Sequence, residues 1–582
     1  MSLLPFGDLP PFRKPAFVPA TIDLGNWPEI EPLFAELERR APLCLTTAEL
    51  EKWLLDQAEL TAALDEEKAR RYIAMTCHTD DPTAEASFLG FAEKIEPEVK
   101  PWQFKLDELF LHHPLRNQLP PSRYLVFNRK KKTEAELFRP ENVALETDET
   151  KLTNEYQKLS GSLTVQFRGE EKTLVAMGRF QEMPDRGLRE EAWRAVAARR
   201  LQERDNFERI FDDMLALREK IAHNAGFSSY LDYAFKLRGR FDYTREDCLR
   251  FHDAIEAEVM PAIREIQKAR KIQLGVDTLR PWDLGVDPQG RAPLKPFTDT
   301  AEMERGTQEI FNRLDPDLAR GFTELRDNRL LDLANRKGKA PGGYQYTLNR
   351  SRVPFIFMNS VGLQRDVETI LHEAGHAFHA LACREDDLTA YREAPIEFCE
   401  VASMSMELIG ADHLDVFYSE ADARRARLVH LEGVIGVFPW IATVDAFQHW
   451  IYTHPGHTHA ERSAAWTALM DRFGGDVDWS GFEDVRANLW HRQLHIFIHP
   501  FYYVEYGIAQ VGALQVWANS RHHPQKALAD YKAGLALGGS RTLPELFAAA
   551  GCHFDFSAGT LRPLIDQVRQ ELDRLANGQA AS

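Results

Sequence analysis

The feature that most constrains this chain is the segment Thr369-Ile-Leu-His-Glu-Ala-Gly-His-Ala-Phe-His379, which contains the pattern H-E-x-x-H. On a helix, residues four positions apart lie on one face, so His372 and His376 can direct their imidazoles at a single ion. Glu373 follows the first histidine and can reach a water molecule bound to that ion. Neutral imidazoles completed by a carboxylate suit Zn²⁺, and an open fourth position makes such a site catalytic. The segment therefore predicts a zinc helix.

A catalytic zinc needs a third protein ligand, and the next predicted helix offers carboxylates. Glu397, Glu400 and Glu407 fall along one stripe of that helix, which is otherwise apolar, so they need a partner charge. Glu397 follows His372 at nearly the spacing of thermolysin-type enzymes, and Glu400 lies one turn further along. The residues alone leave both open as the ligand, and another of the acids can hold a ligand imidazole in its tautomer. His379 is not expected to be a ligand, because no glycine turn precedes it as in metzincins.

A histidine- and tyrosine-rich segment lies further along the chain, His495-Ile-Phe-Ile-His-Pro-Phe-Tyr-Tyr-Val-Glu-Tyr506. If a helix begins near Pro500, Tyr502 and Tyr506 share a face and Tyr503 lies beside them. An enzyme that adds water to an amide needs donors aimed at the developing oxyanion, and phenols and imidazole both qualify. The alternative is an aromatic core cluster.

The composition is that of a soluble globular protein. With 582 residues, 44% of them apolar and 27% charged, the chain can bury a large core in two or more lobes. The net charge of −18 argues against nucleic acid or an anionic membrane as the main partner. The cysteines are scattered without a C-x-x-C pair, the N-terminus lacks a signal-peptide pattern, and no apolar run is long enough to span a bilayer. These features predict a cytoplasmic protein.

Most of the chain is predicted to be helical. Residues 162–174 alternate polar and apolar around a glycine, which predicts a β-hairpin. Residues 353–359 form a short β-type run directly before the zinc helix, either an open edge for an extended peptide or a buried core strand. Apolar residues recur at helical spacing over 27–115, 185–224, 244–272 and most of the chain after residue 395.

The motif segments together resemble the zinc oligopeptidases of the oligoendopeptidase F and thimet oligopeptidase family, and most nearly its bacterial branch that includes the Pz-peptidases. The resemblance covers about residues 150–560. It implies an almost wholly helical fold with two lobes about a deep substrate channel and a small β element beside the zinc helix. We divide the chain into an N-terminal helical region (1–150), a second helical lobe (151–330) and the zinc-binding lobe (331–582). The segments that carry the resemblance are residues 163–174, 340–344, 372–379, 400–407 and 495–506.

The resemblance also implies roles for individual residues. One Zn²⁺ per chain is expected on His372, His376 and Glu400, with Glu407 supporting a ligand imidazole and Glu373 as the general base. His495, Tyr502 and Tyr506 are expected to donate to the tetrahedral intermediate, and Gly343 and Tyr503 to contact substrate. The thimet branch carries one of its tyrosines on a glycine-rich loop, where this chain has Ile498-His499-Pro500. The residue that takes that tyrosine's place is therefore one of Tyr502, Tyr503 and His499.

The sequence thus predicts a zinc metalloendopeptidase that hydrolyses internal bonds of short peptides. One alternative is a zinc exopeptidase, which would need a motif such as G-x-M-E-N to bind a free amine, and this motif does not occur in the chain. The other is a non-catalytic peptide-binding relative, in which the general base would be replaced. The expected partners are short peptides, and the chain is expected to be a monomer or a homodimer.

Overall fold

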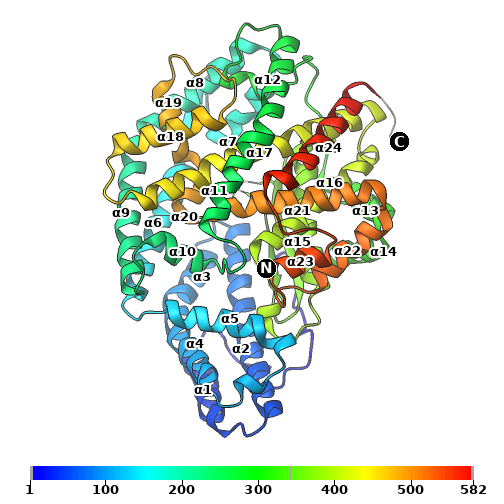
Figure 1. Ribbon diagram of the computed structural model, residues 1–582. Helices are drawn as coiled ribbons and strands as arrows, with labels where there is room; N and C mark the ends of the chain where they lie inside the picture. Colours follow the sequence, from blue (N-terminus) through cyan, green and yellow to red (C-terminus); the bar gives the residue numbers. More distant parts are fainter. Residues whose placement is uncertain (1–3, 337, 341, 579–582) are drawn as a thin grey trace. The chain divides into compact units, whose positions relative to one another are not determined.

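The computed structural model describes residues 4–336, 338–340 and 342–578. The described chain is built mainly of α-helices, with one β-hairpin and one three-stranded sheet (Figure 1). This confirms the predicted mainly helical fold. The residues group into two compact units, each drawn from three separate segments: unit 1 from 1–138, 295–427 and 509–554, and unit 2 from 139–294, 428–508 and 555–582. The predicted division at residues 150 and 330 stays a prediction.

Unit 1 contains the zinc helix predicted from the sequence. Two long helices, α17 (Glu420–Thr453) and α21 (Tyr503–His522), have residues in both units. The other elements of unit 1 are α1 (Trp27–Arg40), α2 (Thr47–Cys77), α3 (Pro82–Lys94), α4 (Glu96–Leu111), α5 (Pro121–Leu137), α13 (Thr300–Leu314), α14 (Pro316–Asp327), β3 (Leu331–Ala334), β4 (Tyr344–Leu348), β5 (Val353–Ser360), α15 (Gln364–Ala382), α16 (Ile396–Gly410), α22 (Pro524–Ala536) and α23 (Leu543–Ala549).

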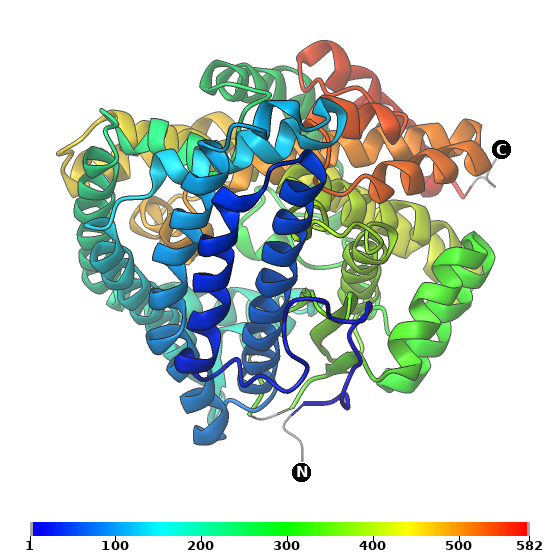
Figure 2. The same ribbon diagram turned by 90° about the horizontal axis from the view of Figure 1, so that it is seen from below.

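The first helices of unit 1 share one hydrophobic core, which Leu388 and Tyr391 of a later segment complete. Thr46 and Glu49 form a capping box that satisfies the first backbone amides of α2. Trp53 of α2 is fully buried, and its indole N–H donates to the Leu37 carbonyl of α1 at 2.7 Å. Figure 2 shows these two helices, dark blue, beside each other.

The sheet of unit 1 has the order β3-β5-β4, so β5 is its central strand. β5 pairs in parallel with β3 and antiparallel with β4, and most of its residues are buried. The open-edge alternative for residues 353–359 is therefore wrong, and the core-strand alternative is right. The apolar run is buried by strands on both sides, which a sequence pattern cannot reveal. The edge strand beside α15 is β4.

Helices α15 and α16 approach each other closely at Gly375. A Cβ atom placed on Gly375 would lie 2.6 Å from the Ala402 carbonyl oxygen and 2.6 Å from the Ser403 Cα. No side chain fits in that space, so the glycine between the two histidines of the motif allows the two helix backbones to touch.

Unit 2 contains the predicted hairpin and long charged helices. The hairpin is confirmed: β1 and β2 pair antiparallel, and Arg168 and Gly169 turn the chain with φ of 53° and 81°. The elements of unit 2 are α6 (Asn142–Ser162), β1 (Thr164–Phe167), β2 (Glu170–Thr173), α7 (Leu174–Met177), α8 (Arg186–Gln202), α9 (Arg204–Asn224), α10 (Tyr230–Leu237), α11 (Arg245–Ala254), α12 (Met260–Leu274), α18 (His459–Phe473), α19 (Glu483–Ala487), α20 (Leu494–Ile498) and α24 (Ala558–Ala576).

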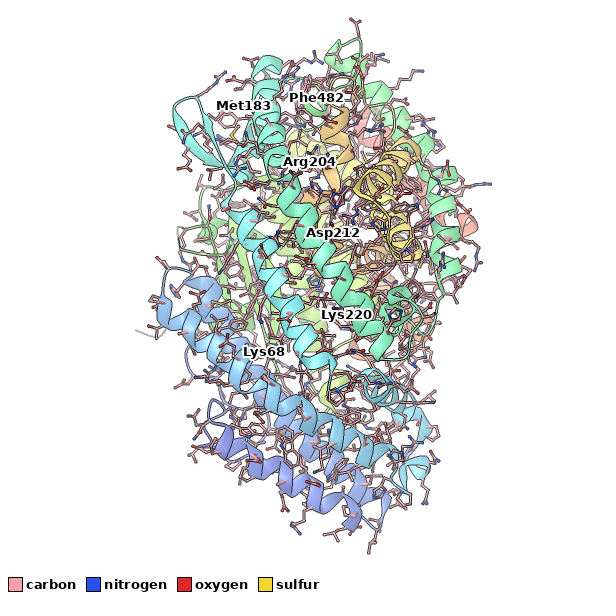
Figure 3. All side chains as sticks on the ribbon, turned by 90° about the vertical axis from the view of Figure 1, so that its left-hand side faces the viewer. Lys68, Met183, Arg204, Asp212, Lys220 and Phe482 are labelled. Atoms are coloured by element: carbon pink, nitrogen blue, oxygen red, sulfur yellow. The ribbon has the colours of Figure 1, made fainter. Side chains whose placement is uncertain are left out.

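Helices α6 and α9 of unit 2 run side by side. Figure 3 shows them together, with Arg204, Asp212 and Lys220 marking the course of α9. Arg218 of α9 is completely buried and donates to the Glu149 carboxylate of α6 at 2.7 Å.

One helix in the described part of the chain, α17, is long and apolar enough to cross a membrane by length and composition. Its most apolar window has a mean hydropathy of 1.3, and 61% of that window is buried inside the protein. Core helices of soluble proteins pass the same test, so this feature is weak support for a membrane span.

Candidate metal centre and donor cluster

Two histidines of α15 and one glutamate of α16 converge in unit 1. The Nε2 atoms of His372 and His376 lie 3.4 Å and 3.7 Å from Oε2 of Glu400. One ligand atom from each of the three residues lies within 4.8 Å of the other two. Two imidazole nitrogens and one carboxylate oxygen are the donor set of a catalytic zinc site, so these residues fit the predicted ion.

Glu407 sets the tautomer of the first histidine. Its Oε1 lies 2.6 Å from Nδ1 of His372. A carboxylate can only accept, so Nδ1 carries a proton and Nε2 is the ring atom left to face an ion. The side chains of His372 and His376 keep 23% and 16% of their surface exposed. The centre is therefore open to a further ligand on one side.

The charges around His372 favour a cation. Burial lowers the pKa of His372, but its hydrogen bond to Glu407 and the charges of Glu407, Glu400 and Glu373 outweigh burial and raise that pKa to about 10. Burial lowers the pKa of His376 well below its ordinary value. A centre where carboxylates outnumber positive charges while one imidazole stays neutral suits a divalent metal ion.

Glu373 lies beside the start of the edge strand. Burial raises its pKa to about 7, helped by Glu400 and opposed by His372, and the backbone amide of Gln345 in β4 partly offsets the rise. A Cβ atom on Gly343 would lie 3.6 Å from Oε1 of Glu373. The backbone of Gly343 therefore passes next to this carboxylate. Pro341 of the same glycine turn lies outside the described residues.

Glu397 and His379, the other two candidate ligands that the sequence offers on this helix pair, are not part of the converging group. Glu397 is buried at 2% exposure, and the atoms that converge with the two imidazoles belong to Glu400. His379 is buried with its ring 5.8 Å from that of Phe398, and its Nε2 has no hydrogen-bond partner among the described residues. Burial lowers the pKa of His379 to about 4.

The predicted donors gather in unit 2. The ring of His495 lies 5.6 Å from that of Tyr502, 4.9 Å from that of Tyr503 and 5.7 Å from that of Tyr506. The rings of Tyr502 and Tyr506 lie 5.4 Å apart. Helix α21 begins at Tyr503, so Tyr502 immediately precedes it rather than lying inside it. We call these four residues the donor cluster. His499 lies beside it, 6.0 Å from the His495 ring.

Two residues that lie outside the sequence motifs, Gln493 and Trp440, orient His495. The side-chain nitrogen of Gln493 lies 2.8 Å from Nδ1 of His495, and the side-chain oxygen of Gln493 accepts the indole N–H of Trp440 at 2.8 Å. Burial, aided by His499 and Arg238, lowers the pKa of His495 to about 4. His495 is thus neutral at pH 7 with its proton on Nε2. Trp440 is 53 residues from Gln493, so the sequence carried no signal for this chain of contacts.

Phe501 joins α20 to the donor cluster in a left-handed backbone conformation, with φ of 62°. Its N–H donates to the Gln448 side chain at 2.5 Å, and its carbonyl accepts from Arg240. A non-glycine residue in this conformation is strained by about 1–2 kcal/mol. Contacts from other parts of unit 2 therefore hold the backbone in the turn that precedes Tyr502.

Comparison with known sequences gives one consistent result. The profile of peptidase family M3 matches residues 179–564, and the profile of the peptidase M3 N-terminal domain matches residues 17–138. Oligopeptidase PepF of Bacillus subtilis (strain 168) is 24% identical over 336 residues, which is 53% of this chain and 48% of PepF. Group B oligopeptidase PepB of Streptococcus agalactiae is 27% identical over 200 residues, 33% of this chain and 32% of PepB. The chain thus spans a third to a half of the length of these relatives.

Comparison with solved structures covers nearly the whole chain. Pz peptidase A, solved with an inhibitor, superposes with a TM-score of 0.89 at 28% identity over 96% of this chain and 99% of that one. Oligoendopeptidase-F from Enterococcus faecium superposes with a TM-score of 0.63 at 16% identity over 95% and 98% of the two chains, a likeness of fold alone.

Proposed function

Because the chain belongs to peptidase family M3, we propose that it is a zinc-dependent oligoendopeptidase that hydrolyses internal bonds of short peptides. The match confirms the predicted family and the predicted metallopeptidase class. The observation that carries the proposal is the convergence of His372, His376 and Glu400.

The proposed metal ligands are His372, His376 and Glu400, with one Zn²⁺ per chain at this centre. A bound zinc ion would polarise the scissile carbonyl and lower the pKa of a coordinated water toward about 7. Glu407 accepts the hydrogen bond from Nδ1 of His372, so Nε2 is the ring atom that would face the ion. Because the pKa of His372 is about 10, Nε2 carries a proton that a binding ion would displace, and the Nδ1 proton would stay with Glu407.

Glu373 is the proposed general base. Its carboxylate takes a proton from the attacking water and passes it to the leaving amine, so that the group returns to its starting state. A pKa near neutrality suits both transfers, and the buried position of Glu373 moves its pKa in that direction.

His495, Tyr502 and Tyr506 are the proposed donors to the tetrahedral intermediate. A neutral imidazole with its proton on Nε2 and two phenol hydroxyls are all hydrogen-bond donors near pH 7. Their support is the chemistry and mutual packing of the donor cluster together with the family resemblance. Which residue takes the place of the tyrosine on the glycine-rich loop of the thimet branch stays a prediction, with Tyr502, Tyr503 and His499 as the alternatives.

Gly343 and Tyr503 are the proposed substrate contacts. Gly343 precedes an edge strand, the kind of element to which an extended peptide can add its own backbone. Without a side chain at residue 343, a peptide backbone can approach Glu373. Short peptides are the proposed substrates and the cytoplasm the proposed location, and the choice between monomer and homodimer stays a prediction.

The proposal is tested with an internally quenched peptide that is blocked at both ends. We expect cleavage that stops with a chelator and returns on adding zinc, with internal cut sites in mass spectra of the products. Cleavage only after the N-terminal block is removed would identify an exopeptidase. Binding without cleavage would identify a non-catalytic relative.

A further inference from the structure

A second group of side chains with metal-ligand chemistry is buried in unit 2. Cys248 lies on α11, and Asp445 and His449 lie on α17. One ligand atom from each lies within 4.8 Å of the other two. None of the three residues is more than 3% exposed.

His252 extends this group by one residue. It lies one turn after Cys248 on α11, is 1% exposed, and its Nε2 lies 2.8 Å from Oδ2 of Asp445. Helix α11 therefore carries the pattern C-x-x-x-H and α17 the pattern D-x-x-x-H. Residues four apart share a helix face, so each helix presents a pair of ligand-type side chains to the same point.

Hydrogen bonds between described residues leave part of this group unsatisfied. Oδ1 of Asp445 and both ring nitrogens of His449 have no hydrogen-bond partner there. Nε2 of His449 lies 3.3 Å from Oδ2 of Asp445, the oxygen that His252 also contacts. Buried polar groups are normally paired, because an unpaired one loses its hydration without compensation. The rings of Phe235 and Phe501 flank His449 at 5.9 Å and 5.4 Å.

We propose that Cys248, Asp445 and His449 bind a structural Zn²⁺ ion, and that His252 positions the Asp445 carboxylate through its hydrogen bond. A thiolate, an imidazole and a carboxylate are donors that zinc takes in proteins. The thiolate and the carboxylate together balance the charge of the ion. The ion joins two helices whose ligands are almost two hundred residues apart in the chain, so metal binding contributes to the folding of unit 2.

The neighbouring charges are compatible with this ion. Arg240 forms a buried ion pair with Glu505 at 3.2 Å, and its charge also interacts with Cys248 and Asp445, which favours the anionic forms of these two proposed ligands. Unit 2 also contains Glu208, Asp212 and His459, whose ligand-type atoms converge in the same way. In that group Arg462 contacts both carboxylates and supplies the positive charge.

The first test is the zinc content of the full-length protein after dialysis against buffered zinc. We expect two equivalents per chain in the wild type and one in Cys248→Ser and in His449→Gln. Glu400→Ala, at the catalytic centre, is expected to retain one. One equivalent in the wild type, unchanged in both unit 2 variants, would overturn the inference. Loss of zinc in His449→Gln with none lost in Glu400→Ala would support the inference and contradict the proposed catalytic ligand set.

The second test uses cobalt and the wild-type fold, so it does not depend on the stability of a variant. Cobalt bound to a thiolate gives an intense sulfur-to-metal charge-transfer band, and the ligands His372, His376 and Glu400 contain no sulfur. We expect the band in the wild type and in the matched control Cys552→Ser, a buried cysteine outside the group. We expect its loss in Cys248→Ser. Absence of the band in cobalt-loaded wild type would overturn the inference.

Discussion

The indole N–H of Trp440 donates to the side-chain oxygen of Gln493 at 2.8 Å, and this contact determines which way round the Gln493 amide lies. An indole nitrogen can only donate, so the amide nitrogen of Gln493 must face Nδ1 of His495. The His495 ring therefore carries its proton on Nε2. Trp440 does not contact His495 through a hydrogen bond, yet through Gln493 it determines which nitrogen of this proposed catalytic histidine carries the proton.

Replacing Gln493 with glutamate should reverse this arrangement. A carboxylate can only accept, so it draws a proton to Nδ1 and raises the pKa of His495 from about 4. Because the pKa starts low, the wild-type ring stays neutral down to about pH 4, and the variant ring gains its charge at a higher pH. We expect kcat to fall about 100-fold at pH 7. Nitrogen NMR shifts of His495 across a pH titration check the change of tautomer.

The matched control for this network is a pair of tryptophan variants. Trp440→Phe removes the donor that orients Gln493 and should lower kcat in the same direction. Trp53→Phe removes a fully buried indole of unit 1 whose N–H donates to the Leu37 carbonyl, and should leave the His495 shifts unchanged. Equal effects on His495 in both variants would contradict the orienting role of Trp440.

Glu373→Gln should separate metal binding from turnover. The amide keeps the size of the side chain but cannot take a proton, so we expect a full zinc content and a loss of activity of about 10³-fold or more. Metal analysis and peptide cleavage on the same preparation check both results. Residual activity within about tenfold of the wild type would refute the assignment of the general base.

Glu400→Ala should lose zinc more readily than Glu397→Ala. Oε2 of Glu400 lies 3.4 Å and 3.7 Å from the two ligand imidazoles, whereas the sequence spacing alone also allowed Glu397. We expect zinc affinity to fall much further in Glu400→Ala, as measured by competition with a chromophoric chelator. The reverse order would make Glu397 the ligand.

Gly375→Ala should weaken metal binding without touching a ligand. The added methyl would lie 2.6 Å from backbone atoms of α16, so the two helices must separate and Glu400 must move away from the imidazoles. Overpacking of this kind costs about 1–3 kcal/mol, and we expect at least tenfold weaker zinc binding. The control is Gly436→Ala in α17, where nothing lies within 4 Å of the new Cβ. That change should stabilise the protein by up to about 1 kcal/mol.

The buried imidazole of His379 should make stability fall in acid. Its pKa is about 4 in the folded protein and about 6.5 when unfolded. Below pH 6.5 the unfolded chain binds a proton that the folded one does not, so the unfolding free energy falls by up to about 1.4 kcal/mol per pH unit until about pH 4. Urea unfolding of chelator-treated wild type and His379→Leu at pH 7, 6 and 5 should show a shallower fall in the variant. Parallel curves would show that His379 does not contribute.

Helices α15 and α16 lie where the sequence pattern predicts them, while their roles in binding zinc stay a proposal. The spacing of His372 and His376 depends only on helix geometry, and so does the stripe that carries Glu400. The role of β5 was harder, because an apolar run has the same pattern whether a strand lies in the middle or at the edge of a sheet. The sequence could not predict contacts between distant segments, such as Trp440 with Gln493 or Cys248 with Asp445. Their spacings within each helix are visible, but nothing in the sequence pairs the helices.

The left-handed turn at Phe501 has a consequence for how this protein can be improved. A glycine at that position would remove about 1–2 kcal/mol of backbone strain, but it would also delete a fully buried phenyl ring, and emptying such a site costs about 3–5 kcal/mol. The same change would free the backbone between α20 and Tyr502, and the donor cluster would lose its fixed spacing. At residue 501 stability and activity are therefore expected to fall together, because the ring that fills the core and the turn that precedes Tyr502 belong to the same residue.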